Sequence, residues 1–218
     1  MACLPLTLFG VAPFTVDQQR RPERIQLDPC CWVDRIEGFV HGADALLYEL
    51  IDSLLWQQGR RVMFGNWYDE PRLTATTSRP DTTTPGAVGE IRSRLNELYG
   101  RSFEGLMCNY YRDGSDSVGW HADRVGHTEV EPLVAIVSLG GPRTFAMRSQ
   151  AEALSERFVL QSGDLLVMGG GTQHHWQHGI AKTSAAAPRI SVTMRAGNQA
   201  ERDGQLGGSL IEYRDLGV

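Results

Sequence analysis

Two stretches in the first half of the chain place apolar residues at helical spacing. Residues 42–58 carry leucine and isoleucine three and four positions apart, and Gly59 follows them. Residues 86–99 repeat the pattern and are followed by Gly100. Because this period puts the apolar residues on one face, the pattern predicts two amphipathic helices that cover a core.

The pattern changes after Gly105, where short β-rich runs alternate with turn residues. The predicted strands are LMCNYY, SVGWHA, LVAIVSL, RTFAMR, RFVLQ, DLLVMG, QHHWQHGI and PRISVTMR. Closely spaced strands with such turns are typical of a sandwich or a barrel. The predicted fold class is therefore α+β and mainly β, a double-stranded β-helix (jelly roll) with N-terminal helices packed on one face. Before the first helix, residues 17–29 are polar and broken by proline, which predicts an irregular arm.

Composition and charge narrow the class of protein. Of the 218 residues, 41% are hydrophobic and 22% are charged, which excludes collagen-like and wholly disordered chains. The net charge is −5 and neither half is basic, so nucleic-acid binding would need a local patch. No run of about 18 apolar residues predicts a membrane span. The four cysteines form no CxxC pair and the N-terminus lacks the positive segment of a signal peptide, which favours the cytoplasm.

A His-x-Asp pair lies in a predicted strand and its continuation. Alternate residues of an extended chain face the same side, so the side chains of His121 and Asp123 can reach one point. A third ligand would come from His174, His175 or His178 in the QHHWQHGI run. Two histidines and one carboxylate with open positions are typical of non-haem Fe(II) oxygenases. Taken alone, the His-x-Asp pair is more typical of a surface turn.

Polar residues alternate strictly with apolar ones in the last predicted strand. Arg189, Ser191, Thr193 and Arg195 therefore share one face. Arginines that point into a barrel are costly unless each meets an anion, and a dicarboxylate lying across the barrel would meet both. The alternative is an exposed strand face with surface arginines. Together with the metal triad, inward arginines indicate an iron(II)/2-oxoglutarate oxygenase.

Several motifs occur together in this half of the chain. They are NYYRDG at 109–114, GWHAD at 119–123, His178, and RISVTMR at 189–195. Together they resemble the AlkB family of iron(II)/2-oxoglutarate-dependent dioxygenases. The resemblance covers residues 60–196 and includes FGNWYDEPRLTATTS, which looks like the family's nucleotide-recognition segment.

The resemblance implies oxidative demethylation of N-alkylated nucleobases in DNA or RNA, as in DNA repair, with release of formaldehyde, succinate and CO₂. It implies Fe(II), 2-oxoglutarate as co-substrate, and O₂. The implied iron ligands are His121, Asp123 and His178. The implied 2-oxoglutarate contacts are Asn109, Tyr111, Ser191, Arg195 near the metal, and Arg189 at the distal carboxylate. The candidate substrate contacts are Trp67, Tyr68, Arg72, Trp120, Val125 and His175.

Two positions depart from the family's pattern. Val125 stands where many repair members carry an acidic residue that can contact the exocyclic amine of a methylated base. Its loss would weaken such substrates unless Glu129 or Glu131 compensates. Ser191 stands where the family often has asparagine, and a serine hydroxyl still makes one hydrogen bond, so we expect a modest effect on co-substrate binding.

Three functions are compatible with these features: a nucleic-acid demethylase, an oxygenase of the same fold that hydroxylates a protein or a small molecule, and an inactive binding module. An arginine rim around the pocket would favour the demethylase; its candidates are Arg60, Arg61, Arg72, Arg79, Arg112 and Arg124. The expected division is a 1–34 arm, a 35–104 helical layer with the nucleotide-recognition segment, a 105–196 dioxygenase jelly roll, and a 197–218 tail. We expect a monomer with alkylated DNA or RNA as its partner.

Overall fold

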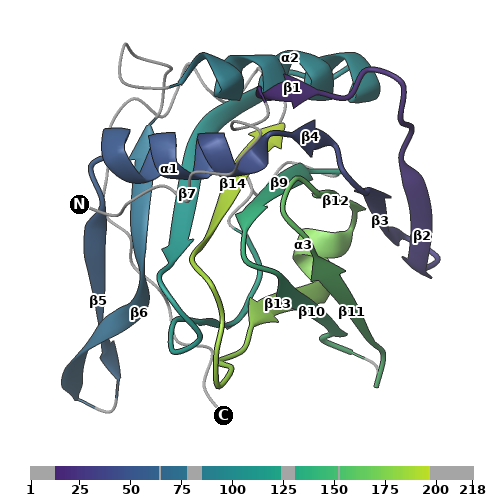
Figure 1. The fold of residues 1–218 in the computed structure, drawn as a ribbon. Coiled ribbons are helices and arrows are strands. Elements are labelled where there is room, and N and C mark those ends of the chain that lie inside the picture. The colour runs from purple at the N-terminus through teal and green to yellow at the C-terminus, as the bar shows by residue number, and fades with distance from the viewer. Residues whose placement is uncertain (1–12, 64, 78–84, 124–130, 152, 197–218) are drawn as a thin grey trace, which may run out of the picture.

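Two antiparallel sheets lie face to face in the computed structural model (Figure 1). The structure describes residues 13–63, 65–77, 85–123, 131–151 and 153–196. The large sheet has the spatial order β2 (Glu23–Asp28), β3 (Cys31–Ile36), β12 (Leu165–Gly170), β9 (Leu133–Gly140), β14 (Arg189–Ala196), β7 (Phe103–Tyr111), β6 (Asn66–Thr77) and β5 (Gln57–Met63). The small sheet has the order β11 (Ser155–Leu160), β10 (Arg143–Ser149), β13 (Trp176–Ile180) and β8 (Val118–His121). This arrangement confirms the jelly roll.

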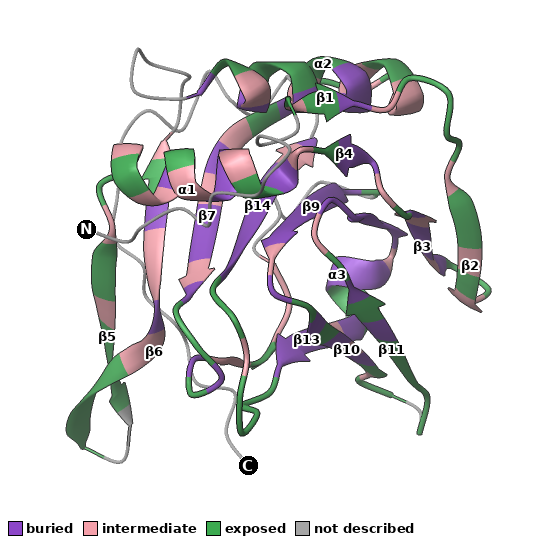
Figure 2. Cartoon of the chain, viewed as in Figure 1, coloured by how far each residue is buried: buried purple, intermediate pink, exposed green. Residues whose placement is uncertain are grey.

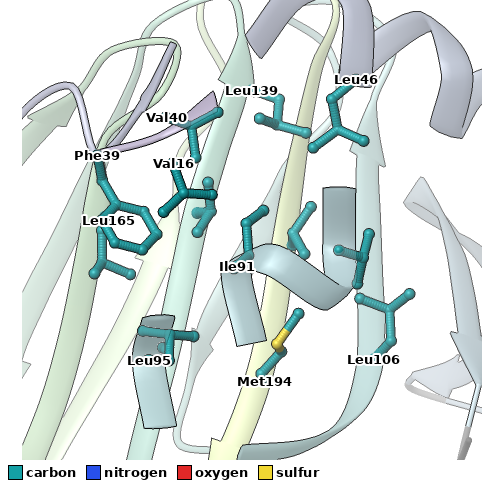
Figure 3. Close-up of a cluster of buried hydrophobic side chains, with 14 of the residues drawn as sticks. Val16, Phe39, Val40, Leu46, Ile91, Leu95, Leu106, Leu139, Leu165 and Met194 are labelled. Carbon is teal, nitrogen blue, oxygen red and sulfur yellow. The ribbon is translucent and has the colours of Figure 1, made fainter. Parts of the chain in front are cut away.

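The helices cover one face of the large sheet. They are α1 (Ala43–Ser53) and α2 (Gly86–Tyr99). A third helix, α3 (Thr172–His175), is a single turn before β13. The short strand β1 (Thr15–Val16) pairs with β4 (Val40–His41). Leu46 of α1 and Ile91 of α2 pack with Leu139 of β9 and Met194 of β14 in one buried cluster (Figure 3). The prediction that the helices pack on one face of the jelly roll is thus confirmed.

A second apolar cluster fills the space between the two sheets. Phe145 and Met147 of β10 and Trp176 of β13 pack there against Ile136 of β9 and Met168 of β12. The central strands β9, β12 and β14 are buried along nearly their whole length, whereas β2 and β5 at the edges are largely exposed (Figure 2). Strands buried on both faces explain the continuous apolar runs in the sequence.

Two predicted elements differ from the structure. The first helix ends at Ser53 rather than at residue 58, and Leu55, beyond its end, is 88% exposed. The predicted arm at 17–29, within the proposed 1–34 segment, contains β2 and is followed by β3, which pairs with β12 in the large sheet. This part of the chain is therefore built into the sheet rather than loose. The second helix has the predicted bounds, 86–99.

The QHHWQHGI run, predicted as one strand, divides into the helical turn α3 and the strand β13. The other predicted strands of the second half are confirmed within a few residues at each end. In the part of the chain that the structure describes, none of the helices has the length and apolar character that crossing a bilayer would need.

Candidate metal centre

Three of the candidate ligands meet at the end of the small sheet. His121 on β8 lies opposite His178 on β13 in the strand register, and the centroids of their rings are 4.3 Å apart. Asp123 follows β8, and its Oδ2 lies 3.5 Å from Nε2 of His178. One ligand atom from each residue lies within 4.8 Å of the others. Strand pairing thus brings together residues 55 or more positions apart in sequence, which no local pattern could show.

Neighbouring groups orient these side chains. Nδ1 of His121 lies 2.9 Å from the carbonyl oxygen of Gly119, so this nitrogen donates and Nε2 keeps its lone pair for a metal. The backbone N–H of Asp123 donates to Oε1 of Gln173 at 2.8 Å, and Phe145 stacks on the ring of His178. Sequence reasoning did not identify Gln173 or Phe145, because neither carries a motif of its own.

Electrostatics favour the protonation states that bind a cation. Burial lowers the pKa of His178 to about 3, so its imidazole is neutral. Burial raises the pKa of Asp123, but the charge of the neighbouring Arg195 and its hydrogen bond help to hold that pKa below its usual value. Nη2 of Arg195 lies 2.5 Å from Oδ1 of Asp123. Two imidazoles and one carboxylate are the donor set of a non-haem iron(II) site, so these residues fit that metal.

The last strand confirms the alternation predicted from the sequence. Ile190, Val192 and Met194 pack in the core under the helices, while Arg189 and its alternate neighbours face the other sheet. Arg189 is fully buried, and its Nε donates to Oγ of Ser138 at 2.9 Å. Among the described residues, neither of its two Nη atoms has a hydrogen-bond partner.

A buried guanidinium with unpaired N–H groups requires an anion. Burial lowers the pKa of Arg189 to about 10, and the group still carries its charge at neutral pH. Its guanidinium carbon lies 5.3 Å from the ring centroid of Tyr111, which forms one wall. The distal carboxylate of 2-oxoglutarate matches the two Nη groups of this guanidinium in charge and shape, so the residues present also fit that co-substrate.

The comparisons with known proteins agree with this geometry. Residues 53–195 match the sequence profile of the 2OG-Fe(II) oxygenase superfamily. The chain belongs to this superfamily. Membership implies Fe(II), 2-oxoglutarate and O₂ as the reaction's cofactor, co-substrate and oxidant. The sequence resemblance to the AlkB family is confirmed by the relatives that this oxygenase matches.

Two of these relatives carry the name alkB homolog. The oxygenase is 32% identical over 181 residues to Alpha-ketoglutarate-dependent dioxygenase alkB homolog 3 of Mus musculus, covering 72% of this chain and 63% of that relative. The human homolog 3 has the same identity and coverage. The chain therefore spans about 63% of the length of these relatives. It is also 29% identical over 178 residues to DNA oxidative demethylase ALKBH2 of Bos taurus, covering 70% of this chain and 64% of that relative.

Solved structures agree on the fold. A prolyl-4-hydroxylase of Pseudomonas putida superposes with a TM-score of 0.55 at 16% identity, covering 77% of this chain and 92% of that one. The structure of OsALKBH1 superposes with a TM-score of 0.54 at 14% identity, covering 79% and 99%. At these identities the likeness shows the shared fold alone.

The oxygenase arranges its candidate co-substrate residues across three adjacent strands. Asn109 on β7 accepts a hydrogen bond at Oδ1 from Nε of Arg72 on β6 at 3.0 Å, and its Nδ2 donates to Oγ of Ser191 on β14 at 3.4 Å. Arg72 is 6% exposed and also pairs with Glu70 at 3.1 Å. Arg72 thus contacts the candidate co-substrate residue Asn109, and its role as a substrate contact stays a prediction.

The remaining substrate candidates are dispersed. Trp120 is 44% exposed on β8, with the guanidinium of Arg148 4.6 Å above its ring. His175 is exposed at the end of α3. Trp67 and Tyr68 are exposed near the tip of the β5–β6 hairpin, which projects from the body of the molecule (Figure 1). Val125 lies outside the described residues.

A cleft of about 270 Å³ opens beside the metal cluster. It is lined by Thr76, Thr77, Glu104, Gly105, Leu106, Met107, Thr193 and Arg195. Arg195 connects the cleft to the cluster because its guanidinium also contacts Asp123. Trp67 lies nine residues before Thr76 on the same strand, which amounts to roughly 30 Å at the ordinary rise of a strand. Trp67 and Tyr68 are therefore not among the residues that line this cleft.

The arginine rim is not found among the described residues. Arg60 and Arg61 lie on the distant hairpin strand β5, Arg72 is buried, and Arg112 pairs with Asp116 at 2.8 Å. The other two candidates, Arg79 and Arg124, lie outside the described residues.

Proposed function

We propose that this chain catalyses iron(II)- and 2-oxoglutarate-dependent oxidative demethylation of N-alkylated nucleobases in DNA or RNA. The observation that carries the proposal is the His121–Asp123–His178 cluster in one barrel with the unpaired guanidinium of Arg189. The names of the relatives supply the substrate class, since one of them is a DNA oxidative demethylase.

The overall reaction balances in atoms. One methylated base, one 2-oxoglutarate and one O₂ give the unmethylated base, formaldehyde, succinate and CO₂. One oxygen atom enters succinate, and the other enters the methyl group, whose hydroxymethyl product leaves as formaldehyde. When bound by His121, Asp123 and His178, the iron would supply the activation of O₂.

The protein's own groups bind and orient the reactants. The Nη atoms of Arg189 would hold the distal carboxylate of 2-oxoglutarate, with Tyr111 as a wall and Asn109 donating from its amide. Arg195 keeps Asp123 ionised and fixes it in place. The buried position of His178 keeps water from competing for the neutral imidazole. These contacts supply positioning, which is the protein's part in a reaction whose difficult chemistry belongs to the metal.

The substrate must reach the metal from the cleft beside Arg195. Its walls carry Thr76, Thr77 and Thr193, whose hydroxyl groups can bond the edge of a base extruded from its stack. The exposed Trp67 and Tyr68, with Arg60 over the ring of Trp67, are not among the residues that line this cleft. We assign them instead to the rest of the polynucleotide, since aromatic and arginine side chains bind single strands by stacking and charge.

Formaldehyde release from methylated oligonucleotides tests the proposal. The purified protein receives Fe(II), 2-oxoglutarate and ascorbate, with single- and double-stranded DNA and RNA in parallel and His121→Ala as the inactive control. We expect formaldehyde only when both iron and 2-oxoglutarate are present. Succinate without formaldehyde from any oligonucleotide would overturn the demethylase and indicate hydroxylation of a small molecule or a protein.

The monomeric state, the cytoplasmic location and the domain boundaries stay predictions.

A further inference from the structure

A second group of metal-ligating side chains lies in the turn between β2 and β3. Sγ of Cys30 lies 3.3 Å from Oδ1 of Asp28 and 3.5 Å from Sγ of Cys31. One ligand atom from each of the three residues lies within 4.8 Å of the others. We propose that Asp28, Cys30 and Cys31 bind one thiophilic divalent cation of the zinc class, with water as the fourth ligand. The proposal is independent of the proposed demethylase function.

The spacing of the donor atoms suits tetrahedral coordination. Zinc binds thiolate sulfur at about 2.3 Å and carboxylate oxygen at about 2.0 Å. At tetrahedral angles these bond lengths separate two sulfurs by about 3.8 Å, and a sulfur and an oxygen by about 3.5 Å. The observed separations of 3.5 Å and 3.3 Å are each within about 0.3 Å of these values. Small side-chain rotations would therefore complete the site without movement of the backbone.

The surroundings provide both access and support. Cys30 is exposed, so an ion can enter and keep a water ligand, while Cys31 is fully buried and holds the opposite side. The indole Nε1 of Trp176 donates to Oδ2 of Asp28 at 2.6 Å and leaves Oδ1 facing the thiols. Outer hydrogen bonds of this kind orient the ligating carboxylate in metal sites.

The charge of the site also suits a cation. Burial raises the pKa of the Asp28 carboxyl, but the hydrogen bonds from Trp176 and from Cys30 outweigh it and lower the pKa to about 2, so the group is ionised. Burial raises the pKa of the Cys31 thiol, so a cation must displace its proton. Binding should therefore release protons and weaken as the pH falls.

This site differs from the candidate iron centre in its donor atoms. Two sulfurs and an oxygen favour a soft or borderline cation, whereas the two imidazoles and the carboxylate of the His121 cluster suit iron(II). Strand β13 connects the two sites, since Trp176 begins it and His178 lies on it two residues later. A cation bound at Asp28 would hold the β2–β3 turn against this strand through the Trp176 hydrogen bond.

Cadmium(II) is the probe that separates the two sites, because only cadmium bound to thiolate gives a sulfur-to-metal charge-transfer absorption. The full chain, stripped of metal and kept reduced, is titrated with Cd(II) and then with competing Zn(II). We expect one thiolate-bound cadmium per chain, which Zn(II) displaces. Cys30→Ser and Cys31→Ser should each weaken binding at least 100-fold, and Asp28→Asn about tenfold. The controls Cys3→Ser and Cys108→Ala should leave the absorption unchanged.

Cys30→Ser decides the outcome, because its exposed side chain can change without loss of the fold. The proposal is overturned if the native chain gives no thiolate absorption, or if Cys30→Ser keeps it at the same affinity. His121→Ala should retain the absorption, which shows that the signal does not come from the iron centre. A demethylase that fails in the formaldehyde assay would leave this titration unaffected.

Discussion

Replacing Arg189 by methionine separates a co-substrate role from a structural one. The side chain is fully buried, makes one hydrogen bond to Ser138, and leaves two Nη atoms without partners among the described residues. A guanidinium that served only the fold would have its donors paired. Arg189→Met keeps a similar length and removes the charge, so it tests whether those unpaired donors exist for an anion.

The structure gives the expected size of two changes, one in the Kd for 2-oxoglutarate and one in the free energy of unfolding. Two charge-assisted hydrogen bonds to a carboxylate contribute about 1.5–3 kcal/mol each, so the Kd for 2-oxoglutarate should rise by about 10²- to 10⁴-fold. Without ligand, the change removes a buried charge and its unsatisfied donors. Replacements of that kind are neutral or raise the free energy of unfolding by about 1–4 kcal/mol. Arg189→Met should therefore be at least as stable as the native chain and bind its co-substrate poorly.

Urea unfolding with and without 2-oxoglutarate measures both quantities. At a ligand concentration 100 times the native Kd, the native chain should gain about 2.7 kcal/mol in unfolding free energy. A variant with 100-fold weaker binding should gain only about 0.4 kcal/mol at the same concentration. Mn(II) can replace Fe(II) in these samples, so that no oxidation occurs during the measurement.

Arg143→Met is the matched control. Its guanidinium lies 5.5 Å from the ring of the same Tyr111, but its Nη atoms donate to the carbonyl oxygens of Asp113, Asp116 and Ala181 at 3.2, 2.8 and 2.6 Å. Its loss leaves those acceptors unpaired, so the control should be less stable and still respond to 2-oxoglutarate. If Arg189→Met behaves like this control, the assignment of Arg189 to the co-substrate is wrong.

Three further predictions concern the same barrel. Arg72→Met should raise the Kd for 2-oxoglutarate about tenfold, measured by the same unfolding shift, because it frees the amide of Asn109; an unchanged shift would contradict that role. His121→Ala should abolish iron binding in a metal analysis, whereas His174→Ala should retain it; equal iron content in the two variants would refute the ligand set. Val125→Asp should increase formaldehyde release from 1-methyladenine or 3-methylcytosine, and no gain would count against the role inferred for that position from the sequence.

Apolar periodicity was sufficient to predict the buried elements of the fold. The strands β9 and β12 carry apolar runs that only a doubly covered sheet would bury, and α2 has the predicted bounds because Gly100 closes it in the left-handed conformation. The first helix is overestimated because Leu54 and Leu55 continue its apolar period after the backbone has become extended. In that case the sequence signal and the chain geometry diverge.

In the segment predicted as an arm, the sequence pattern missed a strand, whereas in the first helix it predicted too many residues. Strand β2 is an edge strand with exposed or half-buried residues, and its apolar alternation is limited to Ile25 and Leu27 among charged and polar neighbours. Its partner β3 contributes to the buried clusters on both faces of the sheet, but it is only six residues long and lies close to Pro29. Edge pairing depends on the neighbouring strand rather than on the segment's own pattern, and a single sequence does not show it.

Some residues of the candidate site can be recognised from short sequence motifs, whereas the contacts of others depend on strand pairing. His121, Asp123 and the alternating arginines lie within short motifs, so the combination of these motifs, and the resemblance that it carries, indicated their chemistry. The contact of Arg72 with Asn109 depends on β6 pairing with β7, and the exposed position of Trp67 near the hairpin tip depends on β6 pairing with β5. A single sequence shows neither of these arrangements, and the substrate contacts stay predictions.

Strand β14 ties the stability of the fold to the geometry of the pocket. Its apolar face packs under the helices through Ile190, Val192 and Met194, and its polar face presents Arg189 and Arg195 to the barrel interior. A shift of one residue in its pairing would place both arginines in the apolar core and the apolar residues in the pocket. The buried face therefore fixes the register with a penalty far larger than the cost of the unpaired guanidinium. A strongly specified strand can thus hold a charged fork in the interior before its anion arrives.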